Sequence, residues 1–300
     1  MYFENRFKIE WWLLELLDRM QNKLFDLLAF LISYIGTGPF HFVLILTIYY
    51  LVDKEKGKKI GFILSIMMIF NNFLKTLFAA KRPFEFAGHE NLRKLNESMD
   101  GATGTSFPSG HVQNTTAILT TTSETFKKRF ITITSIVLII IVALSRIYLG
   151  VHFPGDVIVA TFLGLTISLF ACYMYNHATK NWHKYMIVIL PLIATIPTLI
   201  IEMNNPVSAD IFKSFGFALG FMIAMFCEEK FCQFDQNVPF KTKVIRFIAA
   251  GLFTMICYST KFILPSHNLL ALLRYTLVSI GGFLIVPLII RKKKHHEKYQ

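Results

Sequence analysis

Apolar stretches long enough to cross a lipid bilayer recur along most of the chain. A transmembrane helix needs roughly 20 mostly apolar residues to span ~30 Å of hydrocarbon, and we predict nine such segments, of which the first and third are short. They cover residues 38–52, 60–80, 110–125, 130–149, 153–175, 185–203, 209–227, 244–264 and 269–290. With 54% hydrophobic and 17% charged residues, the chain is too apolar for an ordinary soluble domain. The sequence therefore predicts an all-α, polytopic transmembrane helix bundle.

The apolar pattern divides the chain into three predicted regions. In residues 1–36, charged residues such as Glu15 and Asp18 interrupt a helix-like apolar run. That mixture fits a helix lying in the membrane interface better than a crossing, although a tilted tenth span stays open. Residues 37–180 form the predicted membrane-embedded core. Residues 181–300 hold further transmembrane helices and a basic tail.

The net charge of +12 raises the question whether the chain binds nucleic acid. The placement of the basic residues answers it. They cluster in short loops on one side of the predicted topology, including DKEKGKK at 53–59, KKR at 127–129 and the tail RKKKHHEKYQ at 291–300. By the positive-inside rule that side is cytoplasmic. The charge then reflects orientation and contact with anionic lipids, so we predict membrane lipids and no nucleic acid as partners. Segments 81–109 and 149–153 emerge on the opposite, outer face.

Three polar blocks lie at this outer face, where polar side chains need partners or a function. The blocks read KTLFAAKRP, PSGH and SRIYLGVHFPGD. In the first block, Lys75 and Arg82 are about two helical turns apart and are predicted to share one side of a helix ending near Pro83. In the third block, Ser145 and Arg146 end one predicted span, and His152 and Asp156 begin the next.

The charged and small residues of these blocks suit a phosphate group. Lys75, Arg82 and Arg146 provide three positive side chains, and the planar fork of arginine matches phosphate oxygens. Ser109 followed by Gly110 is predicted to begin a helix, where free N–H groups and the helix dipole favour an anion. We therefore predict that these five residues bind phosphate.

Two histidines complete the predicted site, and histidine can transfer protons or attack phosphorus near neutral pH. Asp156 follows His152 by four residues, with Pro154 in the first helical turn. Its carboxylate is predicted to accept a hydrogen bond from Nδ1 and to leave Nε2 as the nucleophile. His111 has no carboxylate close in sequence, so we expect it to protonate the leaving oxygen and later to activate water.

Structural explanations exist for each residue taken alone. Lys75 could simply extend to the headgroup layer, His152 could be an interfacial histidine, and FPSG could be an ordinary turn. The three blocks together, in order and on one membrane face, favour a shared site.

Other charged residues on the outer side have less regular patterns. Possible metal ligands in the outer loop are Glu85, His89, Glu90, Glu97 and Asp100. Their spacing is irregular, so we predict a solvated loop, with no metal and no cofactor. Charged residues near later span ends are Glu202, Lys213, Lys261 and Arg274. These are expected to extend to the interface, and the alternative is that some flank the site and contact a second phosphate or a headgroup.

The three blocks resemble the signature of the type 2 phosphatidic acid phosphatase superfamily, which also contains bacterial acid phosphatases and vanadium haloperoxidases. The resemblance rests on residues 75–156 and implies a six-helix membrane core, here followed by about three additional C-terminal spans. It implies a metal-independent phosphatase that forms a phosphohistidine on His152, with His111 as acid and base. The implied phosphate-binding residues are Lys75, Arg82, Ser109, Gly110 and Arg146, with Pro83, Pro108 and Ser145 in supporting positions.

The resemblance also implies a substrate class. A phosphate site at the membrane edge suits a lipid phosphate or pyrophosphate, and the family includes phosphatases for polyprenyl pyrophosphate, phosphatidic acid, phosphatidylglycerol phosphate and sphingoid-base phosphate. The stretch YYLVDKEKGKKIGF resembles bacterial members. We therefore expect undecaprenyl pyrophosphate as the substrate, in a bacterial inner membrane, with the site on the periplasmic face and the C-terminus in the cytoplasm. A lipid phosphotransferase would use the same phosphohistidine, and a lipid transporter or scramblase would need the cations but not the histidine pair.

Overall fold

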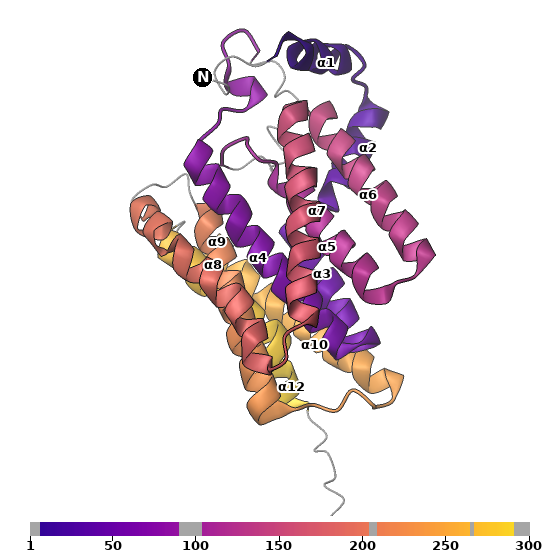
Figure 1. Ribbon diagram of the computed structural model, residues 1–300, viewed down its shortest axis with the longest axis vertical. Helices are drawn as coiled ribbons and strands as arrows, with labels where there is room; N and C mark the ends of the chain where they lie inside the picture. The colour runs from indigo at the N-terminus through magenta and orange to yellow at the C-terminus, as the bar shows by residue number, and fades with distance from the viewer. Residues whose placement is uncertain (1–6, 90–103, 204–208, 265–266, 291–300) are drawn as a thin grey trace, which may run out of the picture.

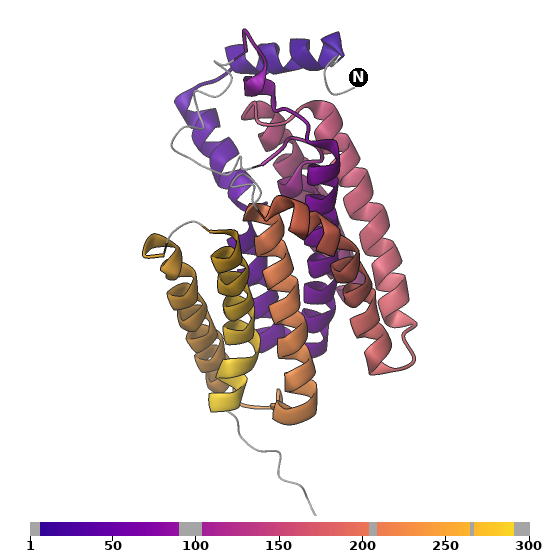
Figure 2. The same ribbon diagram turned by 90° about the vertical axis from the view of Figure 1, so that its left-hand side faces the viewer.

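The computed structural model describes residues 7–89, 104–203, 209–264 and 267–290. Within these ranges the chain is helical and contains no β-strand, which confirms the predicted all-α bundle. Most helices run side by side along the long axis, whereas α1 (Lys8–Arg19) lies across one end (Figures 1 and 2). The last helix, α12 (Val286–Ile289), lies at the opposite end (Figure 1).

The remaining elements follow in chain order. The first part holds α2 (Lys23–Tyr34), α3 (Gly38–Thr47), the π-helical turn η1 (Ile48–Val52), α4 (Lys54–Phe78), the 3-10 turn η2 (Pro83–Glu85), α5 (Gly110–Phe126), α6 (Arg129–Tyr148) and α7 (Pro154–Asn176). The second part holds α8 (Asn181–Glu202), α9 (Ala209–Cys227), the π-helical turn η5 (Glu228–Cys232), α10 (Phe240–Ser259), the 3-10 turn η6 (Thr260–Phe262), α11 (Asn268–Ile280) and the π-helical turn η7 (Gly281–Ile285). α8 continues as one helix through both of its prolines.

Six of the described helical segments are long and apolar enough to cross a membrane, and three of them lie beyond residue 180. They are Lys54–Glu85, Arg129–Tyr148, Pro154–Asn176, Trp182–Glu202, Ala209–Cys232 and Asn268–Ile289. A seventh candidate combines α2 with α3 and η1, which meet at a bend of 52°. The segments predicted at 110–125 and 244–264 correspond to α5 and α10, which are not among the helices long and apolar enough to cross a membrane. α5 has 17 residues and is rich in threonine, and its polar side chains are buried against neighbouring helices.

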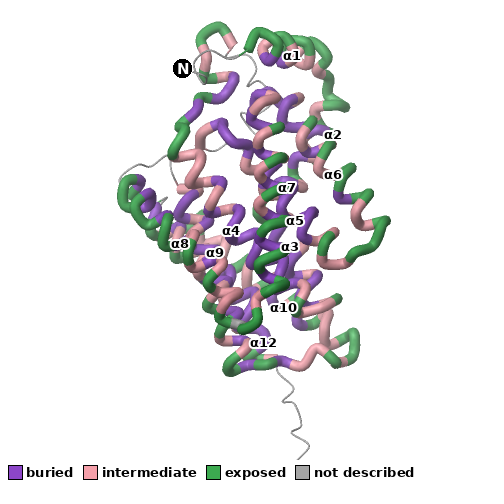
Figure 3. The backbone as a smooth tube through the Cα atoms, viewed as in Figure 1, coloured by how far each residue is buried: buried purple, intermediate pink, exposed green. Residues whose placement is uncertain are grey.

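The outer faces of α6, α7, α8 and α10 are apolar. Large hydrophobic side chains such as Ile140, Phe162, Ile200 and Met255 are more than half exposed. Exposed segments follow the outside of these helices, and buried segments gather in the interior (Figure 3). Apolar surface on this scale is not stable in water. The chain is therefore an integral membrane protein whose outer helix faces contact lipid.

The N-terminal region forms two helices instead of the single interfacial helix predicted for residues 1–36. The chain turns after α1 because the Asn22 side chain caps α2 by accepting hydrogen bonds from the backbone N–H groups of Leu24 and Phe25, at 3.2 and 3.0 Å. α2 then enters the bundle and packs along α6. α1 stays at the end of the bundle, where Glu10 Oε1 accepts from the backbone N–H of Gly155 at 2.9 Å.

Small residues bring the helices of the second part close together. A Cβ atom added to Gly216 or Gly220 would lie 2.3 Å from Leu272 O and 2.4 Å from Thr276 O, respectively. These two glycines on α9, four residues apart, therefore allow backbone contact with α11, as in other membrane helix pairs with this spacing. The contact holds α9 and α11 as one unit beside the core.

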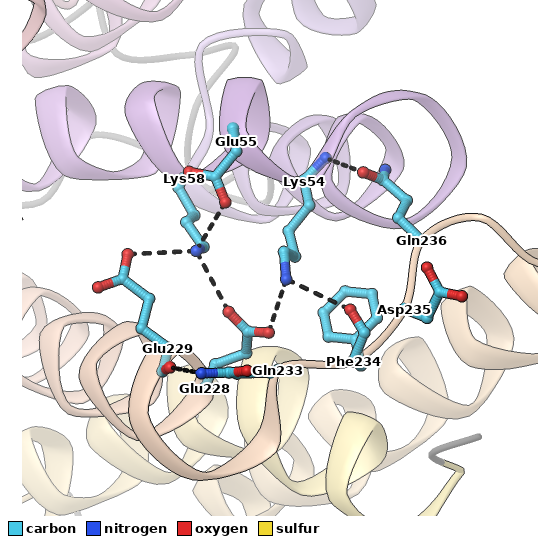
Figure 4. A pocket seen from close by; sticks show the side chains of 9 residues that line it. All are labelled: Lys54, Glu55, Lys58, Glu228, Glu229, Gln233, Phe234, Asp235 and Gln236. Atoms are coloured by element: carbon cyan, nitrogen blue, oxygen red, sulfur yellow. Dashed lines mark hydrogen bonds and ion pairs between the residues drawn. The ribbon is translucent and has the colours of Figure 1, made fainter. Parts of the chain in front are cut away.

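An ion-pair cluster connects the second part to α4 at the end opposite α1 (Figure 4). Lys54 Nζ lies 2.8 Å from Glu228 Oε1, and Lys58 Nζ lies 3.2 Å from both Glu228 Oε2 and Glu229 Oε1. The Glu228 side chain is 0% exposed. Because a buried carboxylate is stable only with such partners, this cluster fixes η5 against the start of α4.

Candidate active site

A cavity of about 570 Å³ brings the three polar blocks together. Its lining includes six of the predicted site residues, namely Lys75, Arg82, Gly110, His111, Arg146 and His152. The other predicted site residues, Pro83, Pro108, Ser109, Ser145 and Asp156, are buried behind that lining. The cavity also extends to α2 and α3 on one side and to α9, α10 and α11 on the other.

Arg82 is fixed by backbone carbonyl groups from two loops. Its Nε donates to Gly104 O at 3.0 Å, and its Nη1 donates to Val151 O at 2.8 Å. The same Nη1 lies 3.3 Å from His152 Nε2. The guanidinium group is therefore held against the imidazole by the loops that precede α5 and α7.

Lys75 and Arg82 do not share a helix as predicted. α4 ends at Phe78, and Ala79 takes a left-handed backbone conformation with φ of 44°. Arg82 therefore lies in the segment after the helix. Lys75 Nζ donates to Thr105 O at 2.5 Å, so both cations contact the loop before α5 and both line the cavity.

Arg146 has hydrogen-bonding capacity that none of the described residues uses. Its Nη1 donates to Ser33 Oγ at 2.5 Å, whereas its buried Nε and Nη2 have no hydrogen-bond partner among the described residues. The Ser109 hydroxyl is likewise buried and unpartnered in this part of the chain. Buried unpaired donors are costly and are seldom left so without a function. On the cavity wall, the Arg146 donors are suited to anion oxygens.

The PSGH turn is held by polar residues that the sequence analysis missed. Ser109 precedes the first residue of α5, as predicted, but its side chain makes no capping hydrogen bond. Asn71 Nδ2 instead donates to Gln113 Oε1 at 2.7 Å and lies 3.4 Å from Pro108 O. A Cβ atom at Gly110 would lie 2.9 Å from Asn71 Oδ1, so glycine allows this close approach. The sequence did carry a signal for these residues, because Asn71 and Gln113 are amide side chains within apolar segments.

Asp156 acts on His152 less directly than predicted. Asp156 Oδ2 lies 3.8 Å from His152 Nδ1, too far for a hydrogen bond. The carboxylate accepts from Ser106 Oγ at 2.5 Å and from the backbone N–H of Phe153 at 3.1 Å. Ser106 Oγ in turn lies 3.5 Å from His152 Nδ1. Ser106, which lies two residues before Pro108 and was not predicted as a site residue, therefore links the two residues.

His152 is held in its neutral form. Burial lowers its pKa well below the usual 6.5, and the neighbouring cations Arg82, Arg146 and Lys75 lower it further. With Nδ1 directed toward Ser106 and Asp156, Nε2 faces Arg82 and the cavity. His111 lies half-buried on the same cavity wall, and Gly36 approaches its ring so closely that an added Cβ atom would lie 2.8 Å from His111 Cβ.

The other charged residues considered as site candidates are the outer-loop set and the residues near later span ends. In the outer-loop set, Glu85 accepts from the backbone N–H of Arg82 at 2.6 Å, and the His89 ring stacks on Trp11 at 3.9 Å. Its other members, Glu90, Glu97 and Asp100, lie outside the described residues. Of the charged residues near later span ends, only Lys213 lines the cavity. Glu202 is buried, Lys261 lies over the Tyr258 ring, and Arg274 donates to Thr260.

Known proteins resemble both parts of the chain. The sequence model of the PAP2 superfamily matches residues 56–180, and that of the PAP2 superfamily phosphatase transmembrane extension matches residues 212–298. The chain is 29% identical over 176 residues to a lipid A 4'-phosphatase from Porphyromonas gingivalis, covering 55% of this chain and 72% of that protein. Superposition on the crystal structure of Aquifex aeolicus LpxE gives a TM-score of 0.45 at 26% identity, covering 55% of this chain and 94% of that chain. The chain belongs to the PAP2 superfamily.

Proposed function

We propose that the protein hydrolyses the phosphate or pyrophosphate of a lipid headgroup through a phosphohistidine on His152, without a metal ion. The observation that carries this proposal is the position of His152 Nε2, 3.3 Å from Arg82 Nη1 in a cavity that Arg146, Lys75 and His111 also line. A neutral imidazole can attack phosphorus, and fixed cations stabilise the charge on a transferring phosphoryl group.

The proposed reaction has two steps. His152 Nε2 attacks phosphorus, the bond from phosphorus to the lipid oxygen breaks, and His111 gives its proton to that oxygen. Water then attacks the phosphohistidine, His111 takes a proton from the water, and the P–N bond breaks to release inorganic phosphate. Through both steps, Ser106 and Asp156 support the positive charge that develops on His152.

Two substrate classes follow from different observations. The stretch YYLVDKEKGKKIGF favours undecaprenyl pyrophosphate in a bacterial inner membrane, and the basic loops favour a periplasmic site with the C-terminus in the cytoplasm. The similarity to a lipid A 4'-phosphatase favours a phosphorylated glycolipid as the second candidate. Both carry the phosphate at the level of the lipid headgroups, where a cavity at the ends of transmembrane helices can reach it.

The test is phosphate release by the purified protein from a panel of lipids: undecaprenyl pyrophosphate, phosphatidic acid and a phosphorylated glycolipid. We expect release in the presence of a metal chelator, inhibition by vanadate, and trapping of an acid-labile phosphoprotein from labelled substrate. His152→Ala should abolish both release and labelling. Near-normal hydrolysis by His152→Ala would overturn the proposed mechanism, and loss of activity with the chelator would overturn metal independence.

The same assay separates the alternative functions. A phosphotransferase would give labelled lipid or sugar in place of inorganic phosphate as the main product. A transporter or scramblase would move lipid across vesicles whether or not His152 is present. The proposed orientation has its own test, in which Lys81→Cys and Lys128→Cys are labelled in sealed spheroplasts. Only the first should react with an impermeant reagent, because the second lies in the loop predicted to be cytoplasmic.

A further inference from the structure

The cavity has a second wall that the superfamily core does not supply. Its lining includes Asp210, Lys213 and Ser214 from α9, Tyr258 from α10 and Tyr275 from α11. All five residues lie beyond residues 56–180, the segment that matches the PAP2 superfamily model. We call these five residues the extension wall. The phosphate-binding side of the cavity thus faces a separate surface built by the second part of the chain.

Hydrogen bonds fix the extension wall relative to the cations. Asn72 Nδ2 donates to Ser214 Oγ at 2.7 Å, and Ser214 Oγ donates to Asp210 O at 2.9 Å. Asn72 is on α4, less than one turn before Lys75. The distance between the wall and the phosphate-binding side is therefore set by direct contacts between α4 and α9.

The wall carries both hydrogen-bond donors and acceptors. Lys213 Nζ donates to Asp210 Oδ1 at 2.7 Å, and the two side chains are 32% and 28% exposed. A Cβ atom at Gly104 would lie 3.7 Å from Asp210 Oδ2, and Gly104 O is the acceptor for Arg82 Nε. The carboxylate therefore stands near the phosphate-binding residues and partly faces the cavity.

This chemistry does not suit a second phosphate group. Asp210 would repel an additional anion, and its ion pair already balances the charge of Lys213. A hydroxyl group, in contrast, both donates and accepts hydrogen bonds and can use a carboxylate, an ammonium group and a phenol together. The rings of Tyr258 and Tyr275, with centroids 6.2 Å apart, add aromatic surface beside these polar groups.

We propose that the extension wall binds the hydroxyl groups of a sugar ring, so that the preferred substrate is a glycolipid whose phosphate is attached to the sugar. This inference rests on the proposed phosphatase function and adds to it the headgroup that the site selects. Asp210 and Lys213 determine this specificity and take no part in the chemical steps.

The test compares selectivity between two substrates. The variant Asp210→Ala with Lys213→Ala removes both charges together and leaves neither unpaired. We expect kcat/KM for a phosphorylated glycolipid, relative to that for phosphatidic acid, to fall by about 10- to 100-fold, mainly through KM, because hydrogen bonds to substrate hydroxyls are lost. Lys81→Ala, which removes an exposed lysine outside the cavity, is the matched control and should leave the ratio unchanged.

Other outcomes would overturn the inference. Equal losses on both substrates would assign the pair a structural role, and a larger loss on undecaprenyl pyrophosphate would mean that Lys213 binds a second phosphate. A binding measurement separates this inference from the proposed function, because it needs no hydrolysis. In the His152→Ala protein, the phosphorylated glycolipid should raise Tm, and removal of the Asp210 and Lys213 side chains should make that rise clearly smaller, because the affinity falls by about 10- to 100-fold. An undiminished rise would refute the inference even if no lipid is hydrolysed.

Discussion

Replacing Arg146 tests whether the unpartnered donors at the cavity belong to the phosphate site. Arg146 is 3% exposed, and among the described residues its guanidinium group donates a hydrogen bond only from Nη1, to Ser33. The two buried donor atoms without a partner in the described chain are Nε and Nη2. A hydrogen bond to a charged group contributes about 1.5–3 kcal/mol, so two such bonds to phosphate oxygens contribute about 3–6 kcal/mol.

The expected loss follows from that figure. Arg146→Met should lower kcat/KM by about 10²- to 10⁴-fold, since each 1.36 kcal/mol is about a factor of ten. Arg146→Lys keeps the charge but loses the fork, so its loss should be about 10- to 100-fold. Ser33→Ala leaves the unpartnered donors in place and should cost less than either substitution.

Stability should change in the opposite direction from activity. A buried donor without a partner costs about 1–3 kcal/mol, and methionine removes that cost. The assay is phosphate release together with thermal unfolding in detergent. We expect Arg146→Met to hold or raise Tm while activity falls. Arg146 does not bind the phosphate through these donors if Arg146→Met keeps kcat/KM within about threefold of the unaltered protein, well below the expected loss, or if Tm and activity fall together.

Three further predictions concern other parts of the structure. Glu228→Ala leaves Lys54 and Lys58 without their buried partner, so unfolding free energy should fall by about 3–5 kcal/mol; an unchanged Tm would show that the cluster is not structurally important. Gly216→Ala places a Cβ atom 2.3 Å from Leu272 O and should destabilise by about 1–3 kcal/mol, whereas Gly251→Ala, whose added atom would have no described neighbour within 4 Å, is the matched control. The lowered pKa of His152 means that the unfolded chain binds its proton first as pH falls below 6.5. Folding stability should therefore drop by up to about 1.4 kcal/mol per pH unit in that range, and His152→Gln should give a measurably shallower dependence of Tm on pH.

Much of the fold could be predicted from local sequence. Apolar segments of spanning length specify helices, because backbone polar groups inside a bilayer must pair within their own segment. The predicted ends were close for α6, which runs from Arg129 to Tyr148, and for α7, which runs from Pro154 to Asn176. Prediction failed where local signals compete, as in the N-terminal region, where Asn22 starts a second helix.

The motif residues were also available from sequence, because phosphate chemistry needs particular side chains at particular spacings. The contacts that support these residues could not be predicted from the sequence. Ser106, Asn71 and Gln113 act through hydrogen bonds to residues distant in sequence, and such pairs have no local pattern. The geometry at Asp156 could not be predicted either. The distance of 3.8 Å between Asp156 Oδ2 and His152 Nδ1 depends on how Ser106 packs between the two side chains.

The sequence by itself thus determined that the chain spans a membrane as helices and carries three polar blocks, whose residues are predicted to bind phosphate. Only the tertiary structure decided that these blocks line one cavity and that α9, α10 and α11 form its second wall. The physical reason is that periodicity and composition act over one or two helical turns. Contacts between helices depend instead on close packing at residues such as Gly216 and Gly220 and on ion pairs such as that of Lys58 with Glu228, whose partners are far apart in the chain.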